Sequence, residues 1–425
     1  MARKMKDSGA DWLGMIPADW DNKRINALYH LRNEKVSDRD YAPLSVSMKG
    51  VVPQLESTAK TDDHDNRKLV REGDFAINSR SDRRNACGIS DRDGSVSLIN
   101  LVLSPREKMY PSFYNWLFHS SQFADEFFRW GHGIVDDLWT TGWQDMKNII
   151  LPYPSLPEQH RIADYLDKKC ASIDSSIETG NKEIEKLKEY KLLVITKAVT
   201  KGLNPNVEII DSGIKDIGKI AKNFDVIRLR FLVKSMRNGY VGPTKDILCD
   251  EGIKYIQSLH IKDGKIDFLR EPYYVSNAWA SIHPKIHTNN LLIIQTGDIG
   301  NVALVDNEYD GCNCHALIIT VIREDKIYPN YLKYYFMSSV GLHALVKYET
   351  GTTLKHLNST DICDSLVCFP NHLDEQIAIA NYLDKKCSEI DTLIHLRQQM
   401  VNKLTEYKKS LIYAYVTGKK EVPHG

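Results

Sequence analysis

The chain has 425 residues, which allows two to four domains at about 100 to 200 residues each. Its 56 basic residues are balanced by 56 acidic residues, which argues against a uniformly basic nucleic-acid-binding surface, so any contact with DNA must be local. The N-terminus is charged, and no run approaches the roughly 18 apolar residues of a membrane helix, so we expect a cytoplasmic protein without membrane contact.

Residues 1–155 have the pattern of a mixed α/β module with many short strands. An apolar strand over residues 73–77 runs into a polar turn at residues 78–80, and residues 98–103 form a second apolar strand. Tyr110-Pro111 then opens an aromatic helix, since proline suits a first helical turn. We expect the aromatic side chains of this helix to belong to the core rather than to stack on bases.

The loop after residue 77 is rich in arginine and in amide side chains. Arginine can hold guanine with two hydrogen bonds, asparagine can do the same for adenine, and both can bind phosphate oxygens. A glycine-rich turn at residues 131–133 is a further candidate. A solvated loop and a plain connecting turn remain alternatives for these segments. The predicted DNA-contacting residues of this module are Asn78, Ser79, Arg80, Arg83, Arg84, Asn85 and His132.

The apolar residues of segment 156–203 recur at heptad spacing, which predicts a long helix with one narrow apolar seam. Lysine and glutamate occupy the other faces, so the seam needs an apolar partner. The predicted pairing residues of this helix are Leu166, Ile173, Ile177, Ile184, Leu187 and Val194.

The whole pattern is then repeated within the chain. The block YLDKKC occurs twice, and its cysteines, Cys170 and Cys387, are related by a numbering offset of 217. The Asp-Ser-Gly motif at residues 7–9 restarts at residues 211–213, an offset of 204. The second copy is therefore thirteen residues longer between these landmarks. The two copies can differ in function in that stretch.

Residues 204–370 form the second mixed α/β module. Apolar strands at residues 291–294 and 316–322 and a helix opened by Tyr328-Pro329 repeat the order of the first module. Its candidate contacts are less dense, although backbone amides of a Gly-Thr-Thr turn could hold a phosphate. The predicted DNA-contacting residues here are Gln257, His260, Lys262, Gln295, Thr296, Thr352, Thr353, Lys355 and His356.

Residues 371–420 repeat the heptad seam of the first helix. The nearest apolar partner for either helix is the other one, so the sequence predicts an α+β protein with two mixed modules and a pair of long helices. Packing of each helix on its own module remains an alternative. The predicted pairing residues of the second helix are Leu383, Ile390, Ile394, Val401, Leu404 and Leu411.

Three stretches resemble a known family, the DNA specificity subunits of type I restriction-modification systems. They are the opening at residues 6–20 with Trp12 and Trp20, the helix entry at residues 156–167, and Gly351-Thr352-Thr353 with the later Phe369-Pro370. The resemblance covers nearly the whole chain. The second helix entry departs from the pattern at Asn371-His372, and the second opening lacks both tryptophans.

The resemblance implies two target-recognition domains that each read one half of a bipartite DNA site, separated by antiparallel coiled-coil spacer helices. It also implies that these helices dock two methyltransferase subunits, through which restriction subunits join. The expected domains are residues 1–155 and 204–370, and the expected spacer helices are residues 156–203 and 371–420. This chain would then hold no cofactor, while S-adenosylmethionine, ATP and Mg²⁺ would belong to the partner subunits.

The competing class is an enzyme, either a methyltransferase or a nuclease with a built-in recognition domain. The residues that such an enzyme needs are missing from the sequence. An amino-methyltransferase needs Asn or Asp followed by Pro-Pro and an aromatic residue, and the nearest string is Asn204-Pro205-Asn206. A phosphate-loop-like stretch at residues 213–220 places Ile220 where a hydroxyl should reach magnesium. The grouping of Cys312, Cys314 and His315 is too crowded for zinc. We therefore expect a non-catalytic subunit without metal. The alternatives are a specificity subunit of a related type II-like complex and a coiled-coil scaffold that does not bind DNA.

Overall fold

The structure is a computed structural model that describes residues 3–54, 64–80, 83–134, 139–351 and 355–423. It divides into two compact units: unit 1 comprises Met1–Asn181 and Gln399–Gly425, and unit 2 comprises Lys182–Gln398. The boundary between the units passes through both long helices. Each unit therefore combines one module with parts of both helices, whereas the sequence led us to expect modules and helices as separate consecutive segments. Within the described ranges, no helix is long and apolar enough to cross a membrane.

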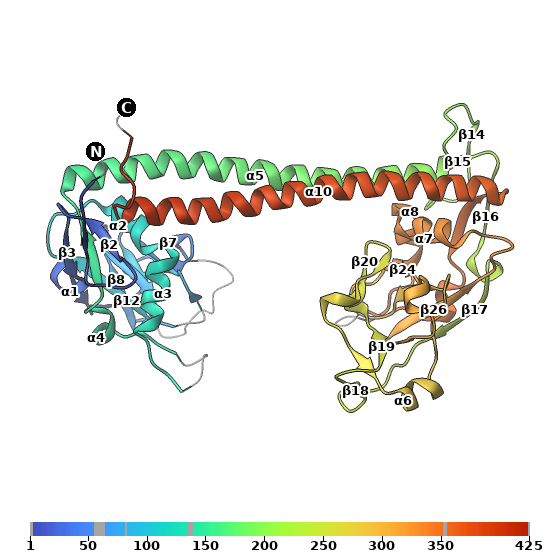
Figure 1. Ribbon diagram of the computed structural model, residues 1–425, viewed down its shortest axis with the longest axis horizontal. Helices are drawn as coiled ribbons and strands as arrows, with labels where there is room; N and C mark the ends of the chain where they lie inside the picture. The colour runs from blue at the N-terminus through green and yellow to red at the C-terminus, as the bar shows by residue number, and fades with distance from the viewer. Residues whose placement is uncertain (1–2, 55–63, 81–82, 135–138, 352–354, 424–425) are drawn as a thin grey trace. The chain divides into compact units, whose positions relative to one another are not determined.

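Unit 1 is built around a four-stranded sheet of order β10-β9-β12-β4 (Figure 1). Its strands are β10 (Cys87–Ile89), β9 (Phe75–Asn78), β12 (Asn100–Pro105) and β4 (Tyr29–Arg32). Strand β9 is buried along its length and pairs antiparallel with both neighbours. Two helices, α2 (Pro111–Phe118) and α3 (Ser121–Arg129), pack on this sheet, and the rings of Phe75 and Phe118 stack with their centroids 3.9 Å apart. Phe113 and Phe118 of the aromatic helix are thus core residues.

The remaining elements of unit 1 before the long helices are short. They are the sheet β11-β8-β5 (Gly94–Val96, Arg67–Val70, Lys35–Val36), the pairs β6-β7 (Leu44–Ser47, Gly50–Pro53), β1-β2 (Met5–Asp7, Met15–Pro17) and β3-β13 (Asp21–Arg24, Ile150–Tyr153), and the helices α1 (Ile25–Leu28) and α4 (Trp143–Met146).

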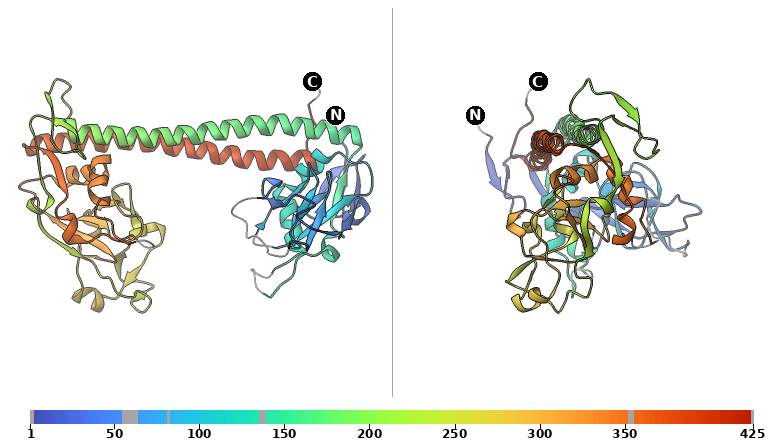
Figure 2. Two further views of the ribbon diagram at one scale, coloured as in Figure 1. Left: turned by 180° about the vertical axis from the view of Figure 1, so that it is seen from behind. Right: turned by 90° about the vertical axis from the view of Figure 1, so that its right-hand side faces the viewer.

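The central sheet of unit 2 has the order β17-β26-β23-β24, and β17, β26 and β23 match β4, β12 and β9 of unit 1 in chain order. These strands are Val233–Asn238, Leu317–Ile322, Leu291–Ile294 and Val302–Leu304. Helices α7 (Pro329–Met337) and α8 (Ser339–Val346) lie between this sheet and the long helices in both side views (Figure 2). The duplication seen in the sequence is therefore a duplication of fold.

Further strands and short helices complete unit 2. They are the sheet β18-β22-β19-β25 (Leu248–Cys249, Tyr274–Val275, Ile253–Ile256, Asn313–Cys314), the pairs β20-β21 (Ile261–Lys262, Lys265–Ile266), β14-β15 (Ile209–Asp211, Lys219–Ala221) and β16-β27 (Phe224–Arg228, Leu366–Pro370), the helices α6 (Asn277–Ile282) and α9 (Ser359–Ile362), and the 3-10 turns η3 (Leu229–Phe231), η4 (Ser258–His260), η5 (Phe268–Arg270) and η6 (Asn307–Tyr309).

Each long helix, α5 (Leu156–Lys201) and α10 (Leu373–Val416), carries in its first turn a buried glutamine that fastens it to its module. Gln159 accepts a hydrogen bond from the Tyr110 backbone N–H at 2.8 Å and donates one to the Pro154 carbonyl at 2.8 Å. Gln376 makes the equivalent bonds to Tyr328, at 2.7 Å, and to Pro370, at 2.9 Å. These side chains satisfy backbone groups that burial would otherwise leave unpaired, which explains the glutamine at both helix entries.

The two helices contact each other in both units through the same pair of repeat positions. In unit 1, Lys408 of α10 donates to Asp174 of α5 at 2.6 Å. In unit 2, Lys191 of α5 donates to Asp391 of α10 at 2.7 Å. The offset of 217 that relates the two cysteines also relates Lys191 to Lys408 and Asp174 to Asp391, so the contact is reciprocal. The alternative that each helix packs only on its own module is therefore wrong.

The helices are antiparallel within each unit. In unit 1, Tyr165 lies before Asp174 in α5, and its ring is 4.6 Å from that of Tyr415, which lies after Lys408 in α10. In unit 2, Glu183 lies before Lys191 and pairs at 3.0 Å with Arg397, which lies after Asp391. Ascending positions in one helix thus meet descending positions in the other.

The predicted seam lies away from solvent along both helices. An added Cβ at Gly180 would lie 2.8 Å from a methyl carbon of Val401, so this glycine permits a close approach of the helices in unit 1. The role of the individual seam residues in pairing remains a prediction that substitution can test. Seven seam residues are buried (Leu166, Ile173, Ile184, Leu383, Ile390, Val401 and Leu411) and five are half-buried (Ile177, Leu187, Val194, Ile394 and Leu404).

We expect Ile184→Asp to destabilise unit 2 by about 3 to 5 kcal/mol, because Ile184 is only 4% exposed and the new carboxylate would be buried without a partner. Thermal and urea unfolding of the full chain measure the change. Asn181→Asp adds the same charge at an exposed position of the same helix and serves as the control. Equal stability of the two variants would contradict the buried seam at this position.

Candidate functional site

In unit 1 the polar turn after β9 meets two other loop segments. The backbone of Arg80 forms an antiparallel bridge with Thr140, which forms a second bridge with His132. The N–H of Thr141 donates to the Ser79 carbonyl at 2.9 Å. The structure thus brings His132 to the arginine-rich loop, although the two are far apart in the sequence.

Unit 2 builds the same arrangement from different side chains. The backbone of Thr296 bridges His356, which in turn bridges Thr350, and the N–H of Leu357 donates to the Gln295 carbonyl at 2.9 Å. The Thr296 hydroxyl also lies 2.7 Å from Nδ1 of His356. A numbering offset of 216 relates Ser79, Arg80, Thr140 and Thr141 to Gln295, Thr296, His356 and Leu357.

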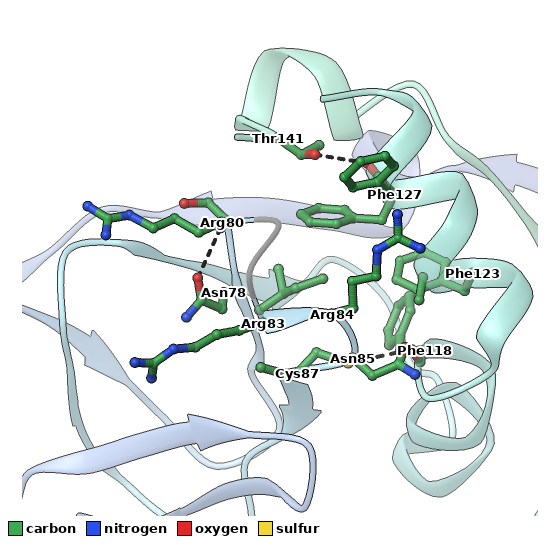
Figure 3. A pocket seen from close by; sticks show the side chains of 15 residues that line it. Asn78, Arg80, Arg83, Arg84, Asn85, Cys87, Phe118, Phe123, Phe127 and Thr141 are labelled. Atoms are coloured by element: carbon green, nitrogen blue, oxygen red, sulfur yellow. Dashed lines mark hydrogen bonds between the residues drawn. The ribbon is translucent and has the colours of Figure 1, made fainter. Parts of the chain in front are cut away.

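The arginine loop lines a small hollow whose other wall is formed by aromatic side chains of α2 and α3 (Figure 3). The guanidinium group of Arg84 lies 4.0 Å from the centroid of the Phe128 ring and 3.3 Å from the Asp125 carboxylate. Figure 3 shows the guanidinium groups of Arg80 and Arg83 pointing away from this aromatic wall. The geometry therefore favours Arg84 as the residue that positions the loop, with Arg80 and Arg83 directed outward.

The amide side chains of the two turns are largely enclosed. Asn78 is 6% exposed, and its side-chain oxygen accepts from the Arg80 backbone N–H at 2.9 Å, so it shapes the turn. Among the described residues, the buried side-chain oxygens of Asn85 and Gln295 have no hydrogen-bond partner. Asn85 also has a positive φ of 62°, which is uncommon outside glycine.

We call the loop segments that meet around Arg80 and Thr140 the polar edge of unit 1, and those that meet around Thr296 and His356 the polar edge of unit 2. The edge of unit 2 extends beyond the residues predicted from the sequence. The N–H of Gln295 donates to the Ala316 carbonyl at 3.2 Å, and the N–H of Ala316 donates to the Tyr240 carbonyl at 2.8 Å. The ends of β23 and β17 and the start of β26 therefore lie side by side, and His315 belongs to this edge. Partial burial lowers the pKa of His315, which favours a neutral ring with one donor and one acceptor.

One predicted contact residue is a core residue instead. His260 has no exposed surface, its Nδ1 accepts from the Gln257 backbone N–H at 3.0 Å, and its Nε2 lies 2.7 Å from the Glu271 carbonyl. Burial also lowers the pKa of His260, so the ring is a neutral part of the fold. The expectation that this side chain faces DNA is corrected on these grounds, because both ring nitrogens are occupied inside the module.

Other predicted residues are scattered. Lys262 lies on the β20-β21 hairpin and lines an open groove beside α5. Gln257 precedes the turn that contains His260. Lys355 is exposed and pairs with Glu349 at 2.5 Å. Thr352 and Thr353 lie outside the described residues.

Sequence reasoning missed Thr140, Thr350, His315 and Tyr240. Only Thr140 left a usable signal, because the offset of 216 that relates Arg80 to Thr296 also relates Thr140 to His356. The others depend on which strand ends meet, and that is a property of the sheet order.

Comparison with known proteins agrees with this architecture. A family model described as the type I restriction modification DNA specificity domain matches residues 233–403. The type I restriction enzyme MjaVIII specificity subunit of Methanocaldococcus jannaschii is 25% identical over 95% of this chain and 93% of its own length. The chain is thus similar, over nearly its whole length, to the DNA specificity subunits of type I restriction-modification systems.

Two further similarities are consistent with this family. The type I restriction enzyme EcoBI specificity subunit of Escherichia coli is 26% identical over 61% of this chain and 57% of its own length. A solved chain from a study of complex assembly and conformational transition of the type I R-M system has a TM-score of 0.69 at 16% identity, covering 95% of this chain and 99% of that one. The similarity to this solved chain shows a shared fold.

We expect Arg84→Ala to lower the stability of unit 1 by about 1 kcal/mol, because it removes a cation–π contact and an exposed ion pair. Arg80→Ala should leave stability unchanged, since its guanidinium group points away from the aromatic wall. Thermal unfolding of both variants checks this difference. Equal destabilisation by the two substitutions would show that Arg84 has no special positioning role.

Proposed function

We propose that this specificity subunit is non-catalytic and that its two units each read one half of a bipartite DNA site. The observation that carries the proposal is the pair of repeat-equivalent polar edges, which share backbone hydrogen bonds but differ in side chains. Thr141 to Ser79 and Leu357 to Gln295 are the same bond in two copies, at 2.9 Å in both. Two modules with the same backbone hydrogen bonds but different side chains are suited to bind two different half-sites.

The chemistry of the two edges supports different preferences. Arg80 and Arg83 can each donate two hydrogen bonds to the O6 and N7 atoms of guanine, or bind phosphate. The Thr296–His356 pair offers a hydroxyl and an imidazole, which can donate or accept at base edges but carries less positive charge. A chain with balanced overall charge can therefore still bind DNA through two local surfaces.

We further propose that the paired helices dock DNA methyltransferase subunits, two in the full assembly, and that restriction subunits join through them. The helices are long, continuous and exposed on the side away from the seam, which suits partner binding. S-adenosylmethionine, ATP and Mg²⁺ would be held by those partners. This division of labour is supported by the similarity to type I specificity subunits and by the lack of methyltransferase and nucleotide-binding motifs in the sequence.

Selection of bound duplexes from a random library should yield a gapped, two-part motif for the chain assembled with its methyltransferase. We expect Arg80→Ala or Arg83→Ala to weaken binding at one part only, by roughly 1 to 3 kcal/mol for a base-contacting arginine. Thr296→Val should alter the other part. Arg92→Ala serves as the control, since Arg92 is paired with Asp91 outside the site. Loss of both parts in one variant would contradict separate readers.

The non-catalytic role is tested by methyl transfer to duplex DNA. The purified chain should transfer no methyl group from S-adenosylmethionine, and activity should arise when the methyltransferase subunit is added. Methylation by the chain alone would overturn the proposal. Absence of any DNA footprint in the assembled complex would favour the scaffold alternative instead.

A further inference from the structure

The imidazole of His315 lies at the polar edge of unit 2 and has no role in the function proposed above. Its backbone N–H donates to the Ile256 carbonyl at 2.8 Å, which ties it to the end of β19. The next residue, Ala316, has a positive φ of 48° and takes the chain from β25, which pairs with β19, into β26, which pairs with β23. Such a conformation is uncommon for a residue with a Cβ, so the surrounding structure must hold the turn beside His315.

Two tyrosine rings fix the orientation of this imidazole. The ring centroids of Tyr255 and Tyr240 lie 6.1 Å and 6.3 Å from that of His315. The His315 side chain is half-buried, and burial lowers its pKa, so the ring is neutral and carries one N–H. A neutral imidazole donates from only one of its two nitrogens, so the tautomer decides which DNA groups it can bind.

The hydroxyl group of Tyr255 selects the tautomer of His315. This hydroxyl lies 3.3 Å from Nδ1 of His315, and Tyr255 has no exposed surface. Burial raises the pKa of Tyr255, so the phenol keeps its proton. A buried O–H group needs an acceptor, and no other acceptor contacts this hydroxyl among the described residues. The phenol therefore donates to Nδ1, and the hydrogen of the imidazole lies on Nε2.

The Nε2 atom of His315 is thus a hydrogen-bond donor without a partner in the unit. No group in the described ranges pairs with this nitrogen, which remains accessible to solvent. His356 at the same edge differs, because its Nδ1 faces the Thr296 hydroxyl, which can either donate or accept. The structure therefore defines the hydrogen-bonding chemistry of His315 but not that of His356.

We propose that His315 is a further specificity-determining residue of unit 2, that it donates from Nε2 to the N7 atom of a purine in the major groove, and that Tyr255 positions it by fixing this donor. The inference rests on the proposed function, which places DNA at this edge. A neutral donor with a fixed direction suits a base edge better than a phosphate, which lysine and arginine bind through their charge.

The tautomer has a consequence for the DNA sequence that unit 2 reads. N7 is an acceptor in both adenine and guanine, whereas cytosine presents a donor in the major groove. One donor cannot tell the two purines apart. We therefore expect the half-site of unit 2 to contain a position that accepts either purine, and His315→Leu should abolish the preference at that position.

Base analogues test the contact atom. Duplexes with the selected two-part motif are prepared with 7-deazaadenine or 7-deazaguanine at each purine, on either strand, of the half-site that Thr296→Val affects. These analogues keep Watson–Crick pairing but lack N7. For the chain assembled with its methyltransferase, we expect one position at which the analogue weakens binding by roughly three- to tenfold, the range for one hydrogen bond. His315→Leu should show the same loss on the natural duplex and no further loss on the analogue.

Further variants separate reading from folding. His315→Gln keeps an N–H donor near the place of Nε2 and should retain most of the affinity, whereas Tyr255→Phe keeps the buried ring but should weaken binding at the same position. His287→Ala is the control, because His287 is an exposed histidine that pairs with Asp310 near the opposite end of β23. Thermal unfolding of each variant shows whether unit 2 stays intact.

The tautomer itself is measured on the chain without DNA. Nitrogen-15 chemical shifts of histidine-labelled chain, assigned with His315→Leu, should show the hydrogen of His315 on Nε2. Tyr255→Phe should remove this preference without unfolding the unit. A hydrogen on Nδ1 in the unaltered chain would overturn the role of Tyr255.

The remaining outcomes distinguish this inference from the proposed function. Binding that no 7-deazapurine weakens would overturn the inference while leaving the proposed function standing. If a methylphosphonate at one phosphate, and no base analogue, abolished the effect of His315→Leu, the residue would contact the DNA backbone and the specificity role would be wrong. Failure of the unaltered complex to select a two-part motif would overturn the proposed function itself.

Discussion

The fold depends on the burial of one apolar seam between α5 and α10. Each helix is largely polar away from that seam, so neither could stay folded over its whole length without the other. The duplication supplies each seam with an apolar partner. Because each helix pairs in antiparallel orientation with a near-copy of itself, every contact between repeat-equivalent positions occurs twice. The reciprocal pairs Lys191–Asp391 and Lys408–Asp174 show this directly. In unit 2 the helix pair also packs into the module core, where Val199 and Leu383 share one cluster with Tyr331.

This constraint separates the parts of the chain that must stay alike from those that can change. The helix seam, the glutamines at the helix entries and the backbone bonds of the polar edges recur in both copies. The side chains at the edges differ, as between Arg80 and Thr296. These side chains can therefore diverge between copies without disturbing the contacts that hold each unit together.

The sequence predicted the features that arise from periodicity and repetition. The heptad spacing of Leu166 to Val194 indicated the pairing helices, and the offset of 217 indicated two modules of the same fold. It did not predict the destination of individual polar side chains. His260 has the residue type of a DNA contact but occupies the core, and Arg84 has the same residue type as Arg80 but packs on Phe128. These outcomes depend on which strand ends and helices meet in three dimensions, and a single sequence carries no local signal for that.

Some local departures from favourable geometry occur at the polar edges. Four non-glycine residues with positive φ occur in the described part of the chain, and two of them, Asn85 and Ala316, adjoin the candidate sites. The enclosed amide oxygens of Asn85 and Gln295 also lack hydrogen-bond partners among the described residues. Such strain persists only where the surrounding structure holds it, and it gathers where side chains must be presented to a ligand rather than to the core. Asn85 and Ala316 sit on backbone that the rest of each unit stabilises, which is compatible with the proposal that the edges present side chains to DNA.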